Sequence, residues 1–181
     1  QNSRKCPPSP MLSRMLNGRG RLGLLRLSSS GPNNVRNSAE SEEEDYELVE
    51  CSNYTTIRAV RYGKEEIGET FHPGVGPEEE GRLLYVQQLQ LLEREKEARH
   101  LRQDFVLWDV GLGAAGNAVV AIRALVANGC PRLRVVSFDR TAGAAKFALQ
   151  HADKLTYMEG FESVISDLIT TGRAETTSGA T

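Results

Sequence analysis

Two aspartates and two glycines between positions 105 and 139 have the types and spacing of a ligand-binding site. Asp109 lies near the end of an apolar run, Gly111 and Gly113 follow it, and Asp139 ends the next apolar run. Glycines after a strand let the backbone approach a ligand, the following helix offers free N–H groups, and a strand-end carboxylate can bind ribose hydroxyls. The pattern predicts a βαβ unit that binds a nucleotide-like cofactor. A turn with only a structural role is the alternative.

Asp109 bears on the identity of that cofactor. A dinucleotide places an anionic pyrophosphate at the helix N-terminus, where a carboxylate would weaken binding. S-adenosylmethionine instead carries a sulfonium and an ammonium group, which a carboxylate favours. Gly113 and Asp139 are 26 positions apart, whereas the dinucleotide pattern has roughly 20. These features favour S-adenosylmethionine. A nicotinamide cofactor, and for Asp109 a strand-end carboxylate facing water or capping a turn, are the alternatives.

The segment from 109 to 117 reads Asp-Val-Gly-Leu-Gly-Ala-Ala-Gly-Asn. It resembles motif I of class I S-adenosylmethionine-dependent methyltransferases, most closely the MnmC-type enzymes that modify the tRNA wobble uridine. Their turn reads acid-x-Gly-Phe-Gly-Thr-Gly-x-Asn, and Ala115 stands in place of one of its glycines. Val-Ser-Phe-Asp139 is similar to the family's Ile-Ser-Phe-Glu. The resemblance implies contact with S-adenosyl-L-methionine by Asp109, Gly111, Gly113, Asn117 and Asp139.

A second stretch, residues 69–86, is similar to the segment that precedes motif I in the same family. The family form is Glu-x-Tyr-His-Ser-x-x-Gly-Ala-x-x-Glu, and His72, Gly76 and Glu80 occupy matching positions. In the family this segment wraps over the cofactor pocket. The resemblance therefore implies that these three residues help to form the pocket in this chain.

The same resemblance implies a reaction and partners. The reaction would be methyl transfer to the aminomethyl group of a modified tRNA wobble uridine, with tRNA as substrate and an oxidoreductase domain as a fusion or partner. The family's later Asp-x-Phe-Ser-Pro motif has no counterpart here. We therefore expect a C-terminally incomplete chain without an assignable catalytic residue. A nicotinamide-dependent oxidoreductase and a non-catalytic truncated homologue are the alternatives.

Periodicity places these motifs on elements. Residues 55–62 and 65–71 favour a β-hairpin, and residues 83–101 and 114–128 favour helices. The predicted fold class is α/β, with a partial Rossmann-like βαβ unit preceded by a β-hairpin and a helix, and a disordered N-terminal region. Four segments follow: a disordered basic leader and acidic linker (1–45), the hairpin and helix (46–104), an incomplete Rossmann-like domain that binds S-adenosylmethionine (105–172) and a disordered tail (173–181).

Charge and cysteine content bear on the cellular location of the protein and on the kinds of site it can contain. Seven basic residues precede the first acid, Glu40. This basic leader suits organellar targeting, an arm attracted to RNA phosphates, or a leader without function. Cys6, Cys51 and Cys130 are few and dispersed, so neither a disulfide framework nor a metal site is expected. No uncharged apolar run is long enough for a membrane span. We expect a cytoplasmic protein; the sequence does not indicate an oligomeric state.

Overall fold

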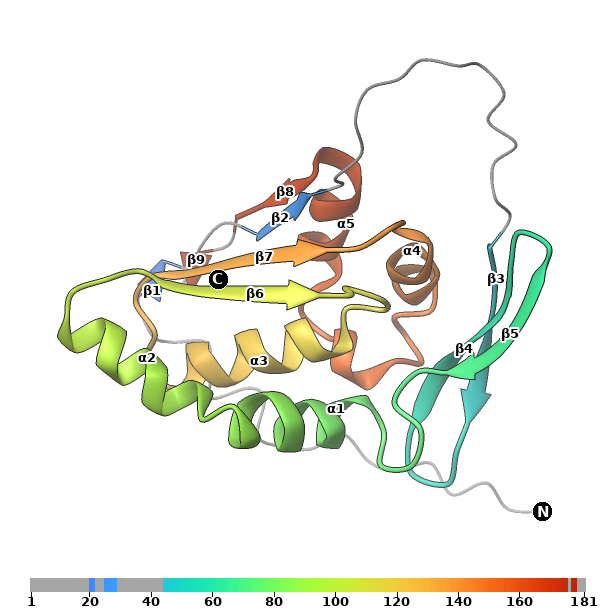
Figure 1. Cartoon of the computed structure of the whole chain (residues 1–181), viewed down its shortest axis with the longest axis horizontal. Helices are drawn as coiled ribbons and strands as arrows, with labels where there is room; N and C mark the ends of the chain where they lie inside the picture. Colours follow the sequence, from blue (N-terminus) through green and yellow to red (C-terminus); the bar gives the residue numbers. More distant parts are fainter. Residues whose placement is uncertain (1–19, 22–24, 29–43, 176, 179–181) are drawn as a thin grey trace.

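The computed structural model describes residues 20–21, 25–28, 44–175 and 177–178, which form a mixed α/β protein (Figure 1). A four-stranded sheet has the strand order β6-β7-β2-β8, and a three-stranded antiparallel sheet has the order β3-β4-β5. β1 (Gly20–Arg21) and β9 (Thr177–Ser178) form a short antiparallel pair. The predicted mixed α/β class is confirmed.

The antiparallel sheet consists of β3 (Glu44–Glu50), β4 (Thr55–Tyr62) and β5 (Glu65–Thr70). β4 and β5 pair as a hairpin around Gly63, whose φ of 57° suits a tight turn. This hairpin was predicted. β3 was not, because its sequence, Glu-Asp-Tyr-Glu-Leu-Val-Glu, begins within the acidic stretch that we assigned to a linker.

A helical segment leads from this sheet to the parallel one. It contains α1 (Pro77–Glu80), the π-helix η2 (Gly81–Gln88) and α2 (Leu91–His100). The sequence predicted a single helix over 83–101, whereas the chain breaks at Gln90, which has a φ of 51°. Regular helical hydrogen bonding does not continue through a left-handed residue, so η2 and α2 replace the single predicted helix.

The parallel part contains β6 (Phe105–Val110), α3 (Gly116–Ala127) and β7 (Leu133–Phe138). β6 and β7 pair in parallel from Phe105 opposite Leu133 to Val110 opposite Phe138. This is the βαβ unit that the sequence predicted. After β7 follow α4 (Gly143–Gln150), the 3₁₀ turn η3 (Thr156–Met158) and α5 (Glu162–Thr171).

Two further strands extend this sheet, in segments expected to be disordered. β2 (Leu25–Ser28) pairs in parallel with β7, and β8 (Arg173–Ala174) pairs antiparallel with β2. At these positions, and at Glu44 and Asp45 in β3, the structure differs from the disorder expected for 1–45 and 173–181. The rest of the basic leader, including Cys6, lies outside the described residues, apart from Gly20–Arg21 in β1.

The core lies between α3 and the sheet. Val119, Ile122 and Leu125 of α3 are buried with Leu133 and Val135 of β7. Because strand residues alternate between faces, the buried positions of β7 leave Arg134, Val136 and Phe138 on the opposite face. The described part of the chain contains no helix with the length and apolar character needed to cross a membrane.

Candidate functional site

The glycine turn joins the carboxyl end of β6 to α3. Gly111 and Gly113 have φ values of 87° and 52°, which side-chain-bearing residues rarely adopt. The Gly111 N–H donates to the Phe138 carbonyl at 2.7 Å, so the turn is tied to the end of β7. A Cβ added at either glycine would meet no atom within 4 Å. Both positions therefore border open space, as a ligand-binding turn requires.

Asp139 lies directly beside this turn. Its Oδ2 accepts the Gly113 N–H at 2.7 Å, and its Oδ1 accepts the Arg140 N–H at 2.6 Å. Residues 26 positions apart are thus in direct contact. The structure brings together the glycine turn and the acid that sequence spacing predicted to lie at neighbouring strand ends.

Asp109, on β6, is buried. Its Oδ2 accepts the Ser137 hydroxyl at 2.8 Å, across the β6–β7 pair. Burial raises the pKa of this carboxyl, the Ser137 hydrogen bond partly opposes that rise, and the negative charge of Asp139 adds to it. The alternative in which the Asp109 carboxylate faces water is therefore excluded. A positively charged ligand group would offset its repulsion with Asp139.

The first turn of α3 contributes the amide of Asn117, and η2 contributes the phenol of Tyr85. The Oδ1 of Asn117 is buried and has no hydrogen-bond partner within the described structure. Burial raises the pKa of Tyr85, as do the charges of Asp109 and Glu80, and a side-chain hydrogen bond with Asn117 opposes the rise. Tyr85 belongs to this cluster, but the sequence analysis did not identify it, because a tyrosine within a helical pattern carries no distinguishing signal.

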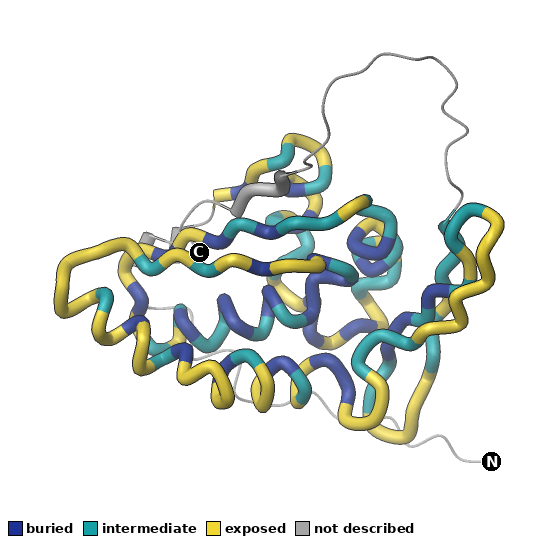
Figure 2. The backbone as a smooth tube through the Cα atoms, in the orientation of Figure 1, coloured by how far each residue is buried: buried dark blue, intermediate teal, exposed yellow. Residues whose placement is uncertain are grey.

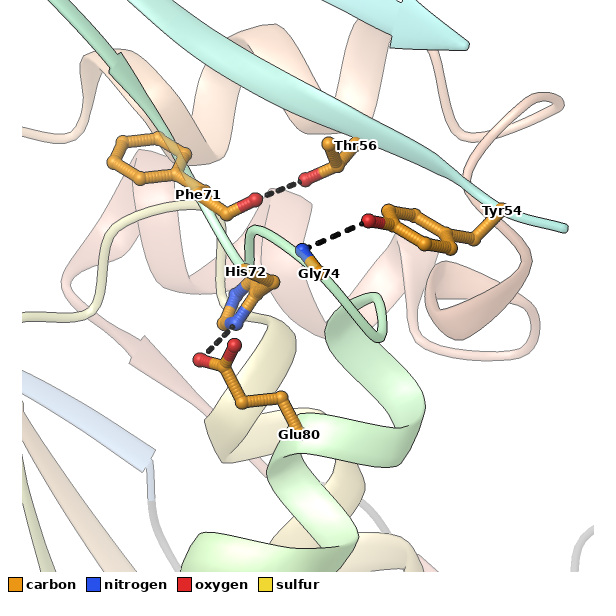
Figure 3. A network of polar contacts seen from close by, with 6 residues as sticks. All are labelled: Tyr54, Thr56, Phe71, His72, Gly74 and Glu80. Carbon is orange, nitrogen blue, oxygen red and sulfur yellow. Dashed lines mark hydrogen bonds and ion pairs between the residues drawn. The ribbon is translucent and has the colours of Figure 1, made fainter. Parts of the chain in front are cut away.

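His72 and Glu80 join the cluster from the segment after β5. The Nδ1–H of His72 donates to Glu80 Oε1 at 3.0 Å (Figure 3). A Cβ added at Gly116, the first residue of α3, would lie 3.0 Å from the His72 Nε2. The His72 ring therefore lies against the N-terminal turn of the helix that follows the glycine turn.

Gly76 has a packing role. Its φ is 86°, and an added Cβ would lie 2.6 Å from Cγ of the Tyr54 ring. The hydroxyl of Tyr54 accepts the Gly74 N–H at 3.0 Å, and the Thr56 hydroxyl donates to the Phe71 carbonyl (Figure 3). These contacts hold the loop against β4. The positive φ and the close packing against Tyr54 explain the glycine at position 76, and no ligand is needed to explain it.

The antiparallel sheet reaches the same edge through Glu44. Its Oε2 accepts hydrogen bonds from the Thr141 hydroxyl at 2.9 Å and from the Tyr46 hydroxyl at 3.1 Å. Thr141 Oγ1 in turn accepts the Gly143 N–H at 3.0 Å, at the start of α4. The Arg140 guanidinium lies 4.1 Å from the centre of the Tyr62 ring. These contacts join the antiparallel sheet to the loop that carries Asp139.

Metal-ligating groups and free thiols are the other side chains that could carry chemistry. Within the described ranges, no group of three or more histidines, cysteines or acids is arranged to hold a metal ion. Cys51 and Cys130 are free thiols, and burial raises the pKa of Cys130 to about 11, which disfavours the reactive thiolate.

Comparison with protein-family models, curated proteins and solved structures found no match to this chain.

Proposed function

We propose that the carboxyl edge of β6 and β7 binds S-adenosyl-L-methionine, and that the chain is the donor-binding part of a class I methyltransferase with a Rossmann-like fold. The observation that carries the proposal is the pair of carboxylates, Asp109 and Asp139, on either side of an open glycine turn. Ligands of open parallel sheets bind at the carboxyl ends of strands. Two acids at that edge favour a ligand with positive charge and ribose hydroxyls.

The local chemistry fits this cofactor. The open space at Gly111 and Gly113 allows close backbone approach, and the unpartnered Asn117 Oδ1 can accept a hydrogen bond from a ligand. Asp139 would hold a ribose hydroxyl through Oδ2, which retains a lone pair beyond the Gly113 N–H, whereas Oδ1 already accepts the N–H groups of Arg140 and Thr141. Asp109 would favour the cationic methionine end. A pyrophosphate here would face both carboxylates, which disfavours a nicotinamide dinucleotide.

The cofactor, when bound, supplies an activated methyl group, because its sulfonium is a good leaving group. The chain contributes binding and orientation, which lower the barrier by holding the donor in one geometry. We propose the acceptor from the sequence resemblance: the aminomethyl group of a modified tRNA wobble uridine. His72, Glu80 and Tyr85 line the α3 side of the site, and no catalytic role is assigned to them.

Calorimetry with three ligands tests the proposal. The wild-type chain is titrated with S-adenosylmethionine, its demethylated product and NAD. We expect the first two to bind and NAD to bind much more weakly. Asp139→Asn should weaken S-adenosylmethionine binding about 10- to 100-fold, as expected for loss of a hydrogen bond to a charged group. Asp153→Asn makes the same change at an exposed acid beyond α4 and should leave binding unchanged.

Two results would decide against this assignment. Tight NAD binding without a response to S-adenosylmethionine would favour the oxidoreductase alternative. Equal effects of Asp139→Asn and Asp153→Asn would remove Asp139 from the site. Incubation with methyl-labelled donor and undermodified tRNA then separates a complete enzyme from a donor-binding homologue, since only the former transfers the label.

A further inference from the structure

β6 carries exposed apolar side chains on one of its two faces. Val106, Trp108 and Val110 alternate along this strand and are 45%, 70% and 82% exposed. Figure 2 shows these exposed positions along the tube of β6. Neighbouring apolar side chains that remain in water are typical of an interaction site. The other residues of the same face indicate what kind of partner binds there.

β7 continues this face and adds a second ring. The parallel register aligns the outward residues of the two strands in the pairs Val106–Arg134, Trp108–Val136 and Val110–Phe138. The rings of Trp108 and Phe138 are 5.5 Å apart, so both lie on the same face of the sheet. We call these six residues the outer sheet face.

Arginines follow in register on the next strands. Arg26 of β2 is paired with Val136 of β7, and Arg173 of β8 is paired with Arg26. Arg134 and Arg173 are exposed, and within the part of the chain that the structure describes neither guanidinium has an ion-pair partner. Positive charge that no acid of the fold compensates favours an anionic partner.

The acids of the four strands and their ends do not offset these arginines. Asp109 is the one acid within the strands, and its side chain is buried on the opposite side from Trp108. Glu175 follows β8, beyond its last paired residue. The arginines therefore favour a partner with negative charge, and the exposed rings favour a partner with flat rings that stack. A single-stranded nucleic acid has both properties.

We propose that a single-stranded nucleic acid binds the outer sheet face. Its bases stack on Trp108 and Phe138, and its phosphates contact Arg134 and Arg173 on the side toward β8. Four-stranded sheets that bind RNA stack two or three bases on aromatic side chains in the same way. Because phosphate contacts and stacking distinguish neither sequence nor sugar, RNA and DNA should bind with similar affinity.

The outer sheet face is separate from the proposed cofactor site. Asp109 lies on the α3 side of the sheet, and the glycine turn with Asp139 lies beyond the ends of β6 and β7. The nucleic-acid proposal therefore does not rest on cofactor binding. Titrations without S-adenosylmethionine test it alone, so failure of one proposal leaves the other standing.

Titration of the full chain with oligo-uridine and oligo-thymidine of about 15 nucleotides tests the stacking. Trp108 is the single tryptophan of the chain, so stacked bases should quench its fluorescence. With a labelled oligomer, Trp108→Ser should raise the dissociation constant about 10-fold or more. Leu101→Ser is the matched control, because Leu101 is 63% exposed at the end of α2, outside the sheet. Circular dichroism verifies that both variants fold.

Salt dependence tests the phosphate contacts. Arg134→Gln should raise the dissociation constant about 3-fold or more, and it should reduce the slope of log affinity against log salt concentration by about 0.7, as for one phosphate contact of a single strand. Arg94→Gln is the matched control, because Arg94 is exposed on α2, which packs on α3. This variant should change neither quantity.

Four outcomes would overturn the proposal. The first is Trp108 fluorescence that does not respond to either oligomer. The second is equally tight binding of a duplex of the same length, because its paired bases do not offer their ring faces and charge alone would explain the result. Equal effects of Arg134→Gln and Arg94→Gln would remove the phosphates from this face. Displacement of the oligomers by an equal concentration of oligoglutamate would indicate an acidic protein segment as the partner.

Discussion

The parallel and antiparallel regions of the molecule use acidic residues in opposite ways. In the antiparallel sheet, Glu47 pairs with Arg58 and Asp45 pairs with Arg61, and all four side chains are at least 40% exposed. In the parallel region, Asp109 is buried and contacts a hydroxyl, with a second carboxylate as its charged neighbour. Exposed ion pairs contribute little to stability. A buried carboxylate without a cation costs stability.

This difference identifies the region in which function is expected. Cross-strand ion pairs keep the acids of the antiparallel sheet satisfied in water, so their positions are explained by folding. The position of Asp109 is not explained in that way, and a strained electrostatic environment at strand ends is typical of ligand sites. Glu44 combines features of both regions, because it belongs to the antiparallel sheet but accepts a hydrogen bond from Thr141 beside the site. Three variants test how far this contrast holds.

The largest effect should come from the junction between the two regions. Gly76→Ala should lower the free energy of unfolding by roughly 2–4 kcal/mol, because the added Cβ would overlap the Tyr54 ring at a positive φ. Gly74→Ala is the matched control: its φ of 105° causes similar strain, but nothing lies within 4 Å. Its loss should be about 1–2 kcal/mol. Urea unfolding measures both, and equal losses would show that contact with Tyr54 does not hold the regions together.

A smaller effect is expected at the contact that crosses from one region to the other. Glu44→Ala should cost about 1–2 kcal/mol, because it removes hydrogen bonds from Thr141 and Tyr46 in a partly buried place. Glu47→Ala, in the same strand, removes only the exposed pair with Arg58 and should cost less than about 1 kcal/mol. If the two variants unfold at the same denaturant concentration, Glu44 contributes no more than a surface ion pair.

The smallest expected change in stability is an increase, for the substitution Asp109→Asn. Burial raises the pKa of Asp109 above its unfolded value of 3.8. The folded state therefore favours the protonated acid, and this contribution is present below the unfolded pKa and is lost as the pH rises through the folded pKa. Asp109→Asn should thus raise the melting temperature at neutral pH by about 2–4 °C, with less gain near pH 4. Thermal unfolding of wild type and Asp109→Asn between about pH 4 and pH 7 measures the difference in melting temperature. Destabilisation by Asn at neutral pH would show that the charge is satisfied within the fold.

The sequence predicted the elements whose signals are local. β6, α3 and β7 follow from apolar runs of the right length with glycines between them, and the β4–β5 hairpin follows from alternation around Gly63. The proximity of Gly113 and Asp139 also followed, because parallel strands bring their carboxyl ends to one edge. For these features, neighbouring residues contain enough information.

Only the tertiary structure determined the features that depend on distant partners. β3 is acid-rich and forms a strand because Tyr46 and Leu48 pack against the core while β4 pairs with it, which leaves Asp45 and Glu47 opposite arginines. Glu44 and Thr141 are 97 positions apart, and no local pattern relates them. Tyr85 joins the site because η2 packs on α3, and Trp108 is exposed because it lies on the face of β6 opposite the buried positions. Hydrophobic periodicity and composition predict single elements, whereas burial and strand pairing depend on which elements pack together in the folded chain.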